Sequence, residues 1–464
     1  MSKFCFKKIC CMLLASLVLF TSACTEQGDG QGGDSSLPPT VESKPDVSMD
    51  ASGWVDGLDD LNDKYKDKTF KVVSSSSSLF NDDGGTPIAK EVTARNDLIA
   101  EKLDIGISCV EKSASDIEKE LRAAINSGKP YADLVCAPAD VLARLAADGL
   151  LENLYSLPYV DFDAGYVNKA ELEGQTVLNT MYMMSGLLTM DVGGTVGIFY
   201  NKKLLNGIGV DPYTSARNGT WTWSELETAA KAVSDGSVYG IESLLEDNDT
   251  LAAVYSSCGG QLISAGIGKE AVAAFDDSVA SYALSLMNGV FKNGEVAGNY
   301  PSDEAAAKAF CEGKLAFLVA KLDNVGLLDG AKSEWGLVPL PKYDSAQRDY
   351  VSPVSGSAMA FAVPKGNTDS GFSGFVLNAL LAASTDRLDK ALKQTYVNYH
   401  FWSNDAALML ERIGDTKRVE LGLVYSSEQD VYNIGVAMLI KEEITPLPVD
   451  KAEAFNSFAD KLFN

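Results

Sequence analysis

Acidic side chains are the residues of this chain whose close spacing could do chemistry. Two facing carboxylates can hydrolyse a glycosidic bond, one as a general acid and the other as a nucleophile or base. In a chain with a formal net charge of −25, however, such pairs are usually solvated surface, so they do not by themselves indicate a hydrolase. The closely spaced carboxylates are Asp59 and Asp60, Asp82 and Asp83, Asp247 and Asp249, and Asp276 and Asp277.

Other catalytic signals are missing from the sequence. His400 is the single histidine, which rules out a multi-histidine metal site. The chain has no Gly-x-Ser-x-Gly nucleophile elbow, no phosphate-binding P-loop and no Gly-x-Gly-x-x-Gly fingerprint. We therefore predict a protein that is not an enzyme, with no catalytic residue, no metal and no cofactor.

The length and the charge of the chain limit its domain organisation and its expected partners. A chain of 464 residues with 46% hydrophobic content can bury more than one core. Nucleic acid and anionic membrane surfaces both require a basic face, so neither is an expected partner.

The N-terminus has the pattern of an export signal. Lys3, Lys7 and Lys8 precede a short apolar run, and the sequence Thr-Ser-Ala-Cys that ends at Cys24 resembles a lipobox. We predict a signal peptide over 1–23, a lipid on Cys24 and a flexible tether over 24–51, which is rich in Gly, Ser, Pro and Asp. The protein would then be anchored on the outer face of the cell membrane, or be periplasmic.

The remaining cysteines are widely and irregularly spaced. Cys109, Cys136, Cys258 and Cys311 match no metal motif. Cys109 and Cys136 lie in apolar, strand-like runs, which favours buried free thiols over a disulfide framework.

In the first folded unit, predicted strands alternate with predicted helices, which is typical of a mostly parallel sheet flanked by helices. Ser115 is the expected cap of the second helix, which we end at Gly128. The strands are expected at Phe70–Val73, Ile105–Val110 and Asp133–Cys136, and the helices at Ile88–Leu103, 115–128 and Pro138–Ala147.

The second unit is built around a strand at Thr195–Tyr200. A helix over Trp223–Val233, capped by Thr222 or Ser224, follows it. Trp335–Pro341 reads as a strand that leaves this unit, and Ser355–Val363 as a strand that re-enters the first sheet.

The segments Gly193–Leu205, Trp223–Val233 and Trp335–Pro341 resemble family 1 extracellular solute-binding proteins, the maltose-binding type that serves ABC importers. The resemblance implies an α/β, two-lobe periplasmic-binding-protein-like fold, with a mostly parallel sheet in each lobe and a multi-crossing hinge. We expect lobe 1 over 52–191 and, on its return, 346–415. Lobe 2 is expected over 192–345, with a C-terminal helical part over 416–464.

Ligands of such folds bind at the carboxyl ends of strands, between the lobes. Asp140 falls where maltose-type binders carry an acidic ligand residue, although a helix cap is an equally good reading. Their neighbouring tryptophan and arginine are Ala137 and Val141 here. The polar candidates are Ser77, Ser78, Asn81, Asp140, Gly194, Thr195, Asp247, Asp249, Lys321, Asp323, Ser355 and Ser357, with hinge glycine as the favoured role of Gly194.

A bound sugar also needs an aromatic face. Phe80, Tyr255 and Trp402 are the candidates for stacking, although such aromatic residues are more often part of the core. We predict a monomeric, lipid-anchored receptor that captures a small solute, with sugar or oligosaccharide as the leading class, and delivers it to an ABC permease. The alternatives are an exported carbohydrate-active hydrolase, an adhesin or scaffold, and a receptor for a cationic peptide or polyamine.

Overall fold

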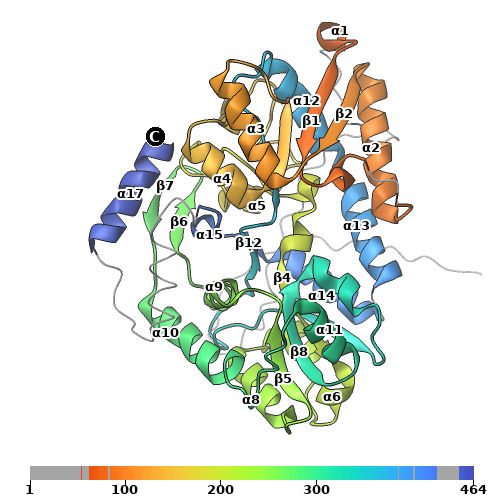
Figure 1. Ribbon diagram of the computed structural model, residues 1–464, viewed down its shortest axis with the longest axis vertical. Coiled ribbons are helices and arrows are strands. Elements are labelled where there is room, and N and C mark those ends of the chain that lie inside the picture. The colour runs from red at the N-terminus through yellow and green to blue at the C-terminus, as the bar shows by residue number, and fades with distance from the viewer. Residues whose placement is uncertain are drawn as a thin grey trace, which may run out of the picture. The chain divides into compact units, whose positions relative to one another are not determined.

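The computed structural model describes residues 54, 62–81, 84–384, 386–400, 403–425 and 449–463 (Figure 1). The predicted signal peptide, Cys24 and the tether lie outside these residues, as does Trp402. Within the described residues, the chain contains no helix that is long and apolar enough to span a bilayer.

The first sheet has the order β11-β3-β1-β2. β1 is parallel to both β2 and β3, with Val72 opposite Cys109 and Val73 opposite Val135, whereas β11 is antiparallel to β3. The predicted mostly parallel sheet is therefore confirmed for the first lobe. Its strands are β1 (Thr69–Ser74), β2 (Gly106–Glu111), β3 (Leu134–Pro138) and β11 (Met359–Ala362).

The second sheet has the order β5-β8-β4-β9. Here too three strands, β5, β8 and β9, run in one direction, and β4 is antiparallel to both of its neighbours, β8 and β9. The chain enters this sheet along β4 and leaves it along β9, so these two strands run in opposite directions. The strands are β4 (Val196–Asn201), β5 (Tyr239–Ser243), β8 (Leu315–Lys321) and β9 (Trp335–Pro339).

Two small strand pairs complete the described sheets. β10 (Ser352–Val354) is parallel to β12 (Lys417–Val419), and β6 (Ile263–Gly266) forms a hairpin with β7 (Lys269–Ala273). The strand predicted over Ser355–Val363 does re-enter the first sheet, but it is shorter than predicted because residues 355–358 form a turn. The chain makes β10, then a turn closed by the Ala358 amide donating to the Ser355 carbonyl (2.9 Å), and then β11.

Local signals explain the ends of several helices. Thr222 accepts a hydrogen bond from the Glu225 amide and caps α8 (Trp223–Val233), as predicted. Ser113, and not Ser115, caps α3 (Ala114–Asn126) by accepting from the Asp116 amide. The sequence offers two serines two positions apart, and the backbone turns at the first of them.

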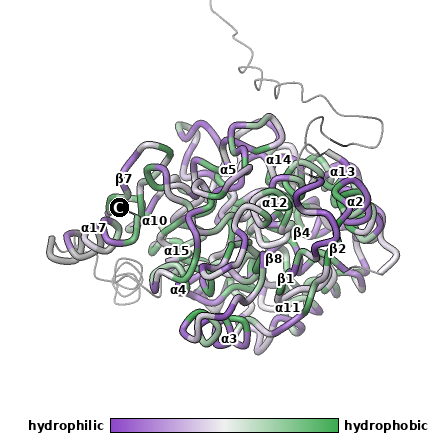
Figure 2. The backbone as a smooth tube through the Cα atoms, turned by 90° about the horizontal axis from the view of Figure 1, so that it is seen from above, coloured by the Kyte–Doolittle hydropathy of each residue, from purple (hydrophilic) through white to green (hydrophobic). Residues whose placement is uncertain are grey.

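The long helices pack against the two sheets and against each other. α2 (Pro87–Leu103) lies beside α12 (Ser370–Ala383) and α13 (Asp386–Tyr399) on the first sheet, and α14 (Asn404–Asp415) packs on β9 (Figure 1). Hydrophobic and hydrophilic residues alternate along α3, as its mixed colours show (Figure 2). The other helices are α1 (Asn62–Tyr65), α4 (Ala139–Ala147), α5 (Lys169–Glu173), α6 (Lys202–Asn206), α7 (Pro212–Arg217), α9 (Asp247–Ser257), α10 (Asp277–Leu286), α11 (Asp303–Cys311), α15 (Leu421–Val424) and α17 (Val449–Phe463).

Candidate functional site

The first crossing between the sheets lies directly beside the return crossing. Ser355 donates its amide to the carbonyl of Gly194 (2.9 Å), and Thr195 forms an antiparallel bridge with Val354. The hydroxyls of Ser355 and Ser357 are 3.0 Å apart in the turn that follows β10. The structure thus brings four predicted site residues together: Gly194, Thr195, Ser355 and Ser357. Thr195 itself is fully buried, and its hydroxyl donates to the Asp191 carbonyl.

Asp140 joins this group through the backbone. Its amide donates to the carbonyl of Gly356 (3.0 Å), at the start of α4. The carboxylate pairs with Arg144 one helical turn later (3.2 Å) and is 36% exposed. Pro138 occupies the cap position of this helix without a side-chain bond, so the alternative reading of Asp140 as the cap is wrong.

Asp323 reaches the same crossing from the end of β8. The next residue back, Leu322, donates its amide to the Thr195 carbonyl (3.0 Å), and the Asp323 Cβ lies 3.4 Å from where a Cβ on Gly193 would be. Burial raises the pKa of the Asp323 carboxyl, and the nearby Lys321 partly opposes the rise. The residue itself is exposed, so the carboxylate can be reached from solvent.

Tyr396 is a residue at this crossing that sequence reasoning missed. Its hydroxyl lies 3.6 Å from the position that a Cβ on Gly193 would occupy. Burial raises the pKa of this phenol. Tyr396 comes from α13, more than two hundred positions after Gly193, and no motif around it indicates proximity to that glycine.

The candidates Ser77, Ser78 and Asn81, which follow β1, form hydrogen bonds within their own segment and to β2. The Ser77 carbonyl accepts from the amides of Phe80 and Asn81, the Ser78 hydroxyl is 2.8 Å from that of Ser76, and the Asn81 amide group donates to the Cys109 carbonyl. Phe80 is 3% exposed. Its ring packs against the guanidinium of Arg95, 5.2 Å from the ring centre, so it is a core residue.

The other second-lobe candidates, Asp247, Asp249 and Tyr255, lie on α9, which contacts β10. Asp247 and Asp249 lie in the exposed first turn of α9, where Asp247 pairs with Lys292 (3.2 Å). Tyr255 is 3% exposed and stacks on Phe275 at 5.6 Å. Its hydroxyl donates to the Gln261 carbonyl and accepts from the Asp276 amide, which makes it a core residue too.

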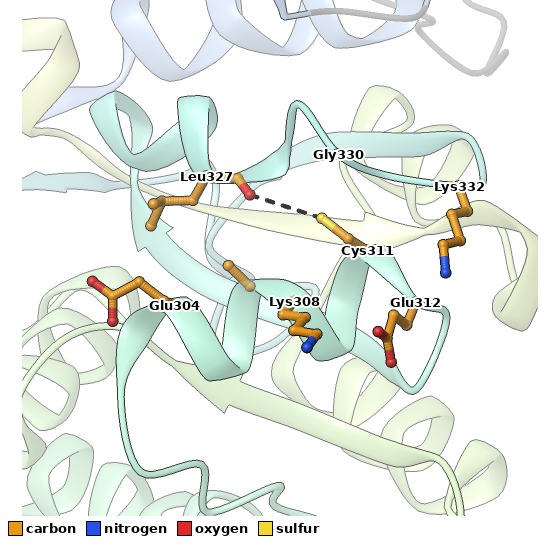
Figure 3. Close-up of a pocket in the computed structure, with 8 residues that line it drawn as sticks. Glu304, Lys308, Cys311, Glu312, Leu327, Gly330 and Lys332 are labelled. Atoms are coloured by element: carbon orange, nitrogen blue, oxygen red, sulfur yellow. Dashed lines mark hydrogen bonds between the residues drawn. The ribbon is translucent and has the colours of Figure 1, made fainter.

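A pocket of about 300 Å³ between α11 and the segment after β8 is lined by none of these residues (Figure 3). The Cys311 thiol lies 3.8 Å from the carbonyl of Leu327 at its wall, and burial raises the pKa of that thiol. Cys109, Cys136, Cys258 and Cys311 are all free, as predicted, although Cys109 is only half-buried. Besides Cys311 and Leu327, the pocket is lined by Glu304, Ala307, Lys308, Glu312, Gly330 and Lys332.

Comparison with solved structures supports the fold. The GacH receptor of Streptomyces glaucescens, described free and with acarbose, matches with a TM-score of 0.52 at 16% identity, over 86% of this chain and 98% of that one. A cyclic α-maltosyl-1,6-maltose binding protein from Arthrobacter globiformis matches with a TM-score of 0.57 at 17% identity, over 85% and 98%. A family 1 extracellular solute-binding protein from Bifidobacterium longum subsp. infantis gives 0.54 at 14%, over 86% and 99%. These likenesses confirm the two-lobe α/β fold class.

No curated protein matches the chain. The model of the family described as bacterial extracellular solute-binding protein matches residues 82–372, well over half of the chain. Members of this family bind solutes and are not enzymes, which confirms the prediction made from the missing catalytic signals. The chain belongs to the bacterial extracellular solute-binding protein family.

Proposed function

We propose that this protein is an exported, lipid-anchored receptor that captures a sugar or oligosaccharide and passes it to an ABC importer. One observation carries the assignment of the site: the crossing gathers short polar side chains from three separate segments. Ser355 and Ser357 supply hydroxyls, and Asp140 and Asp323 supply carboxylates. Such groups form the paired hydrogen bonds that sugar hydroxyls require.

The charge balance favours a sugar over a cationic peptide or polyamine. A cationic ligand would have to bind the candidate aspartates Asp140, Asp247, Asp249 and Asp323. Two of these four already have cationic partners: Asp140 pairs with Arg144 and Asp247 with Lys292. Lys321 also opposes the charge of Asp323. A ligand cation would have to displace these partners, whereas a neutral sugar only needs acceptors and donors.

The neighbours point to the same ligand class. The GacH receptor was solved in complex with acarbose, and the Arthrobacter protein is a cyclic α-maltosyl-1,6-maltose binding protein. Phe80 and Tyr255, two of the residues predicted to stack on a sugar, are buried in the core. This burial argues against sugar stacking on these two rings. Trp402 remains a proposed stacking residue.

A thermal-shift screen tests the proposal. The protein from residue 25 onward would be heated with maltose, maltotriose, a cyclodextrin, galactose, spermidine and a tripeptide. A true ligand at about 100 times its dissociation constant adds about 2.7 kcal/mol to the stability, which shifts the melting temperature by several degrees. A shift with spermidine or the tripeptide alone would contradict a sugar receptor, and no shift at all would favour the scaffold alternative.

A further inference from the structure

A buried charge triad joins the segments that cross between the lobes. The Lys417 ammonium lies 2.6 Å from Asp191 and 2.9 Å from Glu171. The side chains of Lys417, Asp191 and Glu171 are only 11%, 3% and 16% exposed. Asp191 and Lys417 are 226 positions apart, so the triad is a product of the fold and not of local sequence.

The three charges come from three different parts of the fold. Asp191 begins the turn Asp191–Gly194 of the first crossing, Glu171 lies on α5, and Lys417 starts β12. β12 is the partner of β10, which leads into the Ser355–Ser357 turn. Lys417 is therefore linked to the candidate site along two routes, through Asp191 to Gly194 and through β10 to Ser355.

The backbone at the first crossing needs such an anchor. Met190 has φ of 53°, in the left-handed region that an aliphatic side chain rarely adopts. A strained conformation persists only when its surroundings hold it. The ion pair to Asp191, the very next residue, and the hydrogen bond from the Asp191 amide to the Gly186 carbonyl hold this one.

Substitutions of the three charged residues can distinguish a positioning role of the triad from a purely stabilising one. With both acids ionised, one ammonium faces two carboxylates, so removing Lys417 alone would leave two buried charges unpaired, which strongly destabilises a fold. Replacing a whole buried ionic group by neutral residues is often tolerated. A triad that served only to stabilise the chain could thus be neutralised without any local effect at the site.

We infer that Lys417, held by Asp191 and Glu171, is a positioning residue that keeps the first crossing and the Ser355–Ser357 turn in the register required for solute binding. This inference rests on the proposed function for its link to binding, but its structural part can be tested without any ligand.

Amide hydrogen exchange of the unliganded protein provides that test. The Ser355 amide bonds to Gly194, and the Leu322 amide bonds to Thr195, so both report on the crossing. The Asp133 amide, bonded to Lys71, and the Tyr239 amide, bonded to Lys314, report on the first and second sheets.

The neutral variant Lys417→Met/Asp191→Asn/Glu171→Gln is compared with the wild type and with Lys231→Met, which removes only an exposed helical ion pair with Glu227. We expect exchange at Ser355 and Leu322 to be at least about tenfold faster in the neutral variant, with Asp133 and Tyr239 nearly unchanged, because local opening is independent of global unfolding. Unchanged exchange at Ser355 and Leu322, or an equal increase at all four amides, would overturn the inference.

A binding measurement completes the test, with maltotriose as the probe. If maltotriose binds the wild type, we expect its affinity for the neutral variant to fall by about tenfold, as coupling through a contact network allows, at a melting temperature close to that of the wild type. Unchanged affinity would overturn the positioning role. Failure of maltotriose to bind the wild type would count against the proposed function, while the exchange result would still decide the inference.

Discussion

Gly194 lies so close to Ala358 that a Cβ added to the glycine would come within 2.7 Å of the alanine Cβ. This contact joins the first crossing to the turn that returns the chain to the first sheet. The close approach, and not a positive φ, is what requires glycine here, since Gly194 is absent from the residues with φ above zero.

Gly194→Ala should therefore destabilise the protein by about 1–3 kcal/mol, because overpacking forces the backbone to shift. Chemical denaturation measures the loss. Ala358→Gly in the same chain should restore much of it by removing the opposing methyl group. Gly414→Ala is the control: nothing lies within 4 Å of its added Cβ, so this helical site should gain stability. Equal changes in stability for Gly194→Ala and Gly414→Ala would show that the close contact with Ala358 does not matter.

Asp140→Ala should weaken solute binding with little change in stability. Its carboxylate is paired with the half-buried Arg144 one turn away, and ion pairs close to the surface contribute about 1 kcal/mol or less. Glu227→Ala is a matched control, because Glu227 and Lys231 form the same spacing of ion pair on α8. Calorimetric titration with the solute found in the screen measures both variants. Equal affinities for Asp140→Ala and Glu227→Ala would remove Asp140 from the site.

Tyr255→Phe should lower stability and leave affinity intact. The change deprives the Asp276 amide and the Gln261 carbonyl of their shared partner, and a buried unpaired polar group costs about 1–3 kcal/mol. Tyr159→Phe removes a hydroxyl bonded to Lys64 from a ring that is 44% exposed, so it should be nearly neutral. A loss of affinity in Tyr255→Phe at normal stability would return Tyr255 to the binding site.

Asp276 gives a pH-dependent prediction. Its side chain caps α10 by accepting from Ser278 and Val279, and these hydrogen bonds lower its pKa below the ordinary 3.8. A carboxyl with a depressed pKa in the folded state stabilises the fold above pH 3.8, and this contribution disappears as the pH falls through the lower folded value.

Asp276→Ala should thus cost about 1 kcal/mol near neutral pH, as loss of a cap does. The difference from the wild type should shrink in urea titrations at progressively more acidic pH. Asp276→Asn keeps a capping oxygen and should retain most of the stability at neutral pH. A gap between Asp276→Ala and the wild type that does not depend on pH would contradict the role of the charge.

Local features of the chain were predictable because their causes are local. Thr222 caps α8 because a threonine precedes a helical pattern, and the strands around Val72 and Phe199 follow from runs of apolar residues. The direction of β4 was not predictable in this way. It depends on how the chain crosses between the sheets, which alternating strands and helices do not specify.

The candidate site was predictable only in part, for a similar reason. Residues at strand ends, such as Asp140 and Ser355, could be proposed from position alone. Whether an aromatic ring is buried depends on distant partners, so Phe80 and Tyr255 could not be assigned to the core beforehand. Lys417 finds its carboxylates only after more than two hundred intervening residues have folded.

The four free thiols of the described residues have a practical consequence for how this receptor reaches its working form. Because none of them is cross-linked, folding of this part needs no oxidation step and no choice among disulfide pairings. The same sequence should mature equally well in an oxidising or a reducing compartment. The protein can also carry a pair of introduced, exposed cysteines for attaching fluorophores, since burial raises the pKa values of the native thiols and so lowers their reactivity.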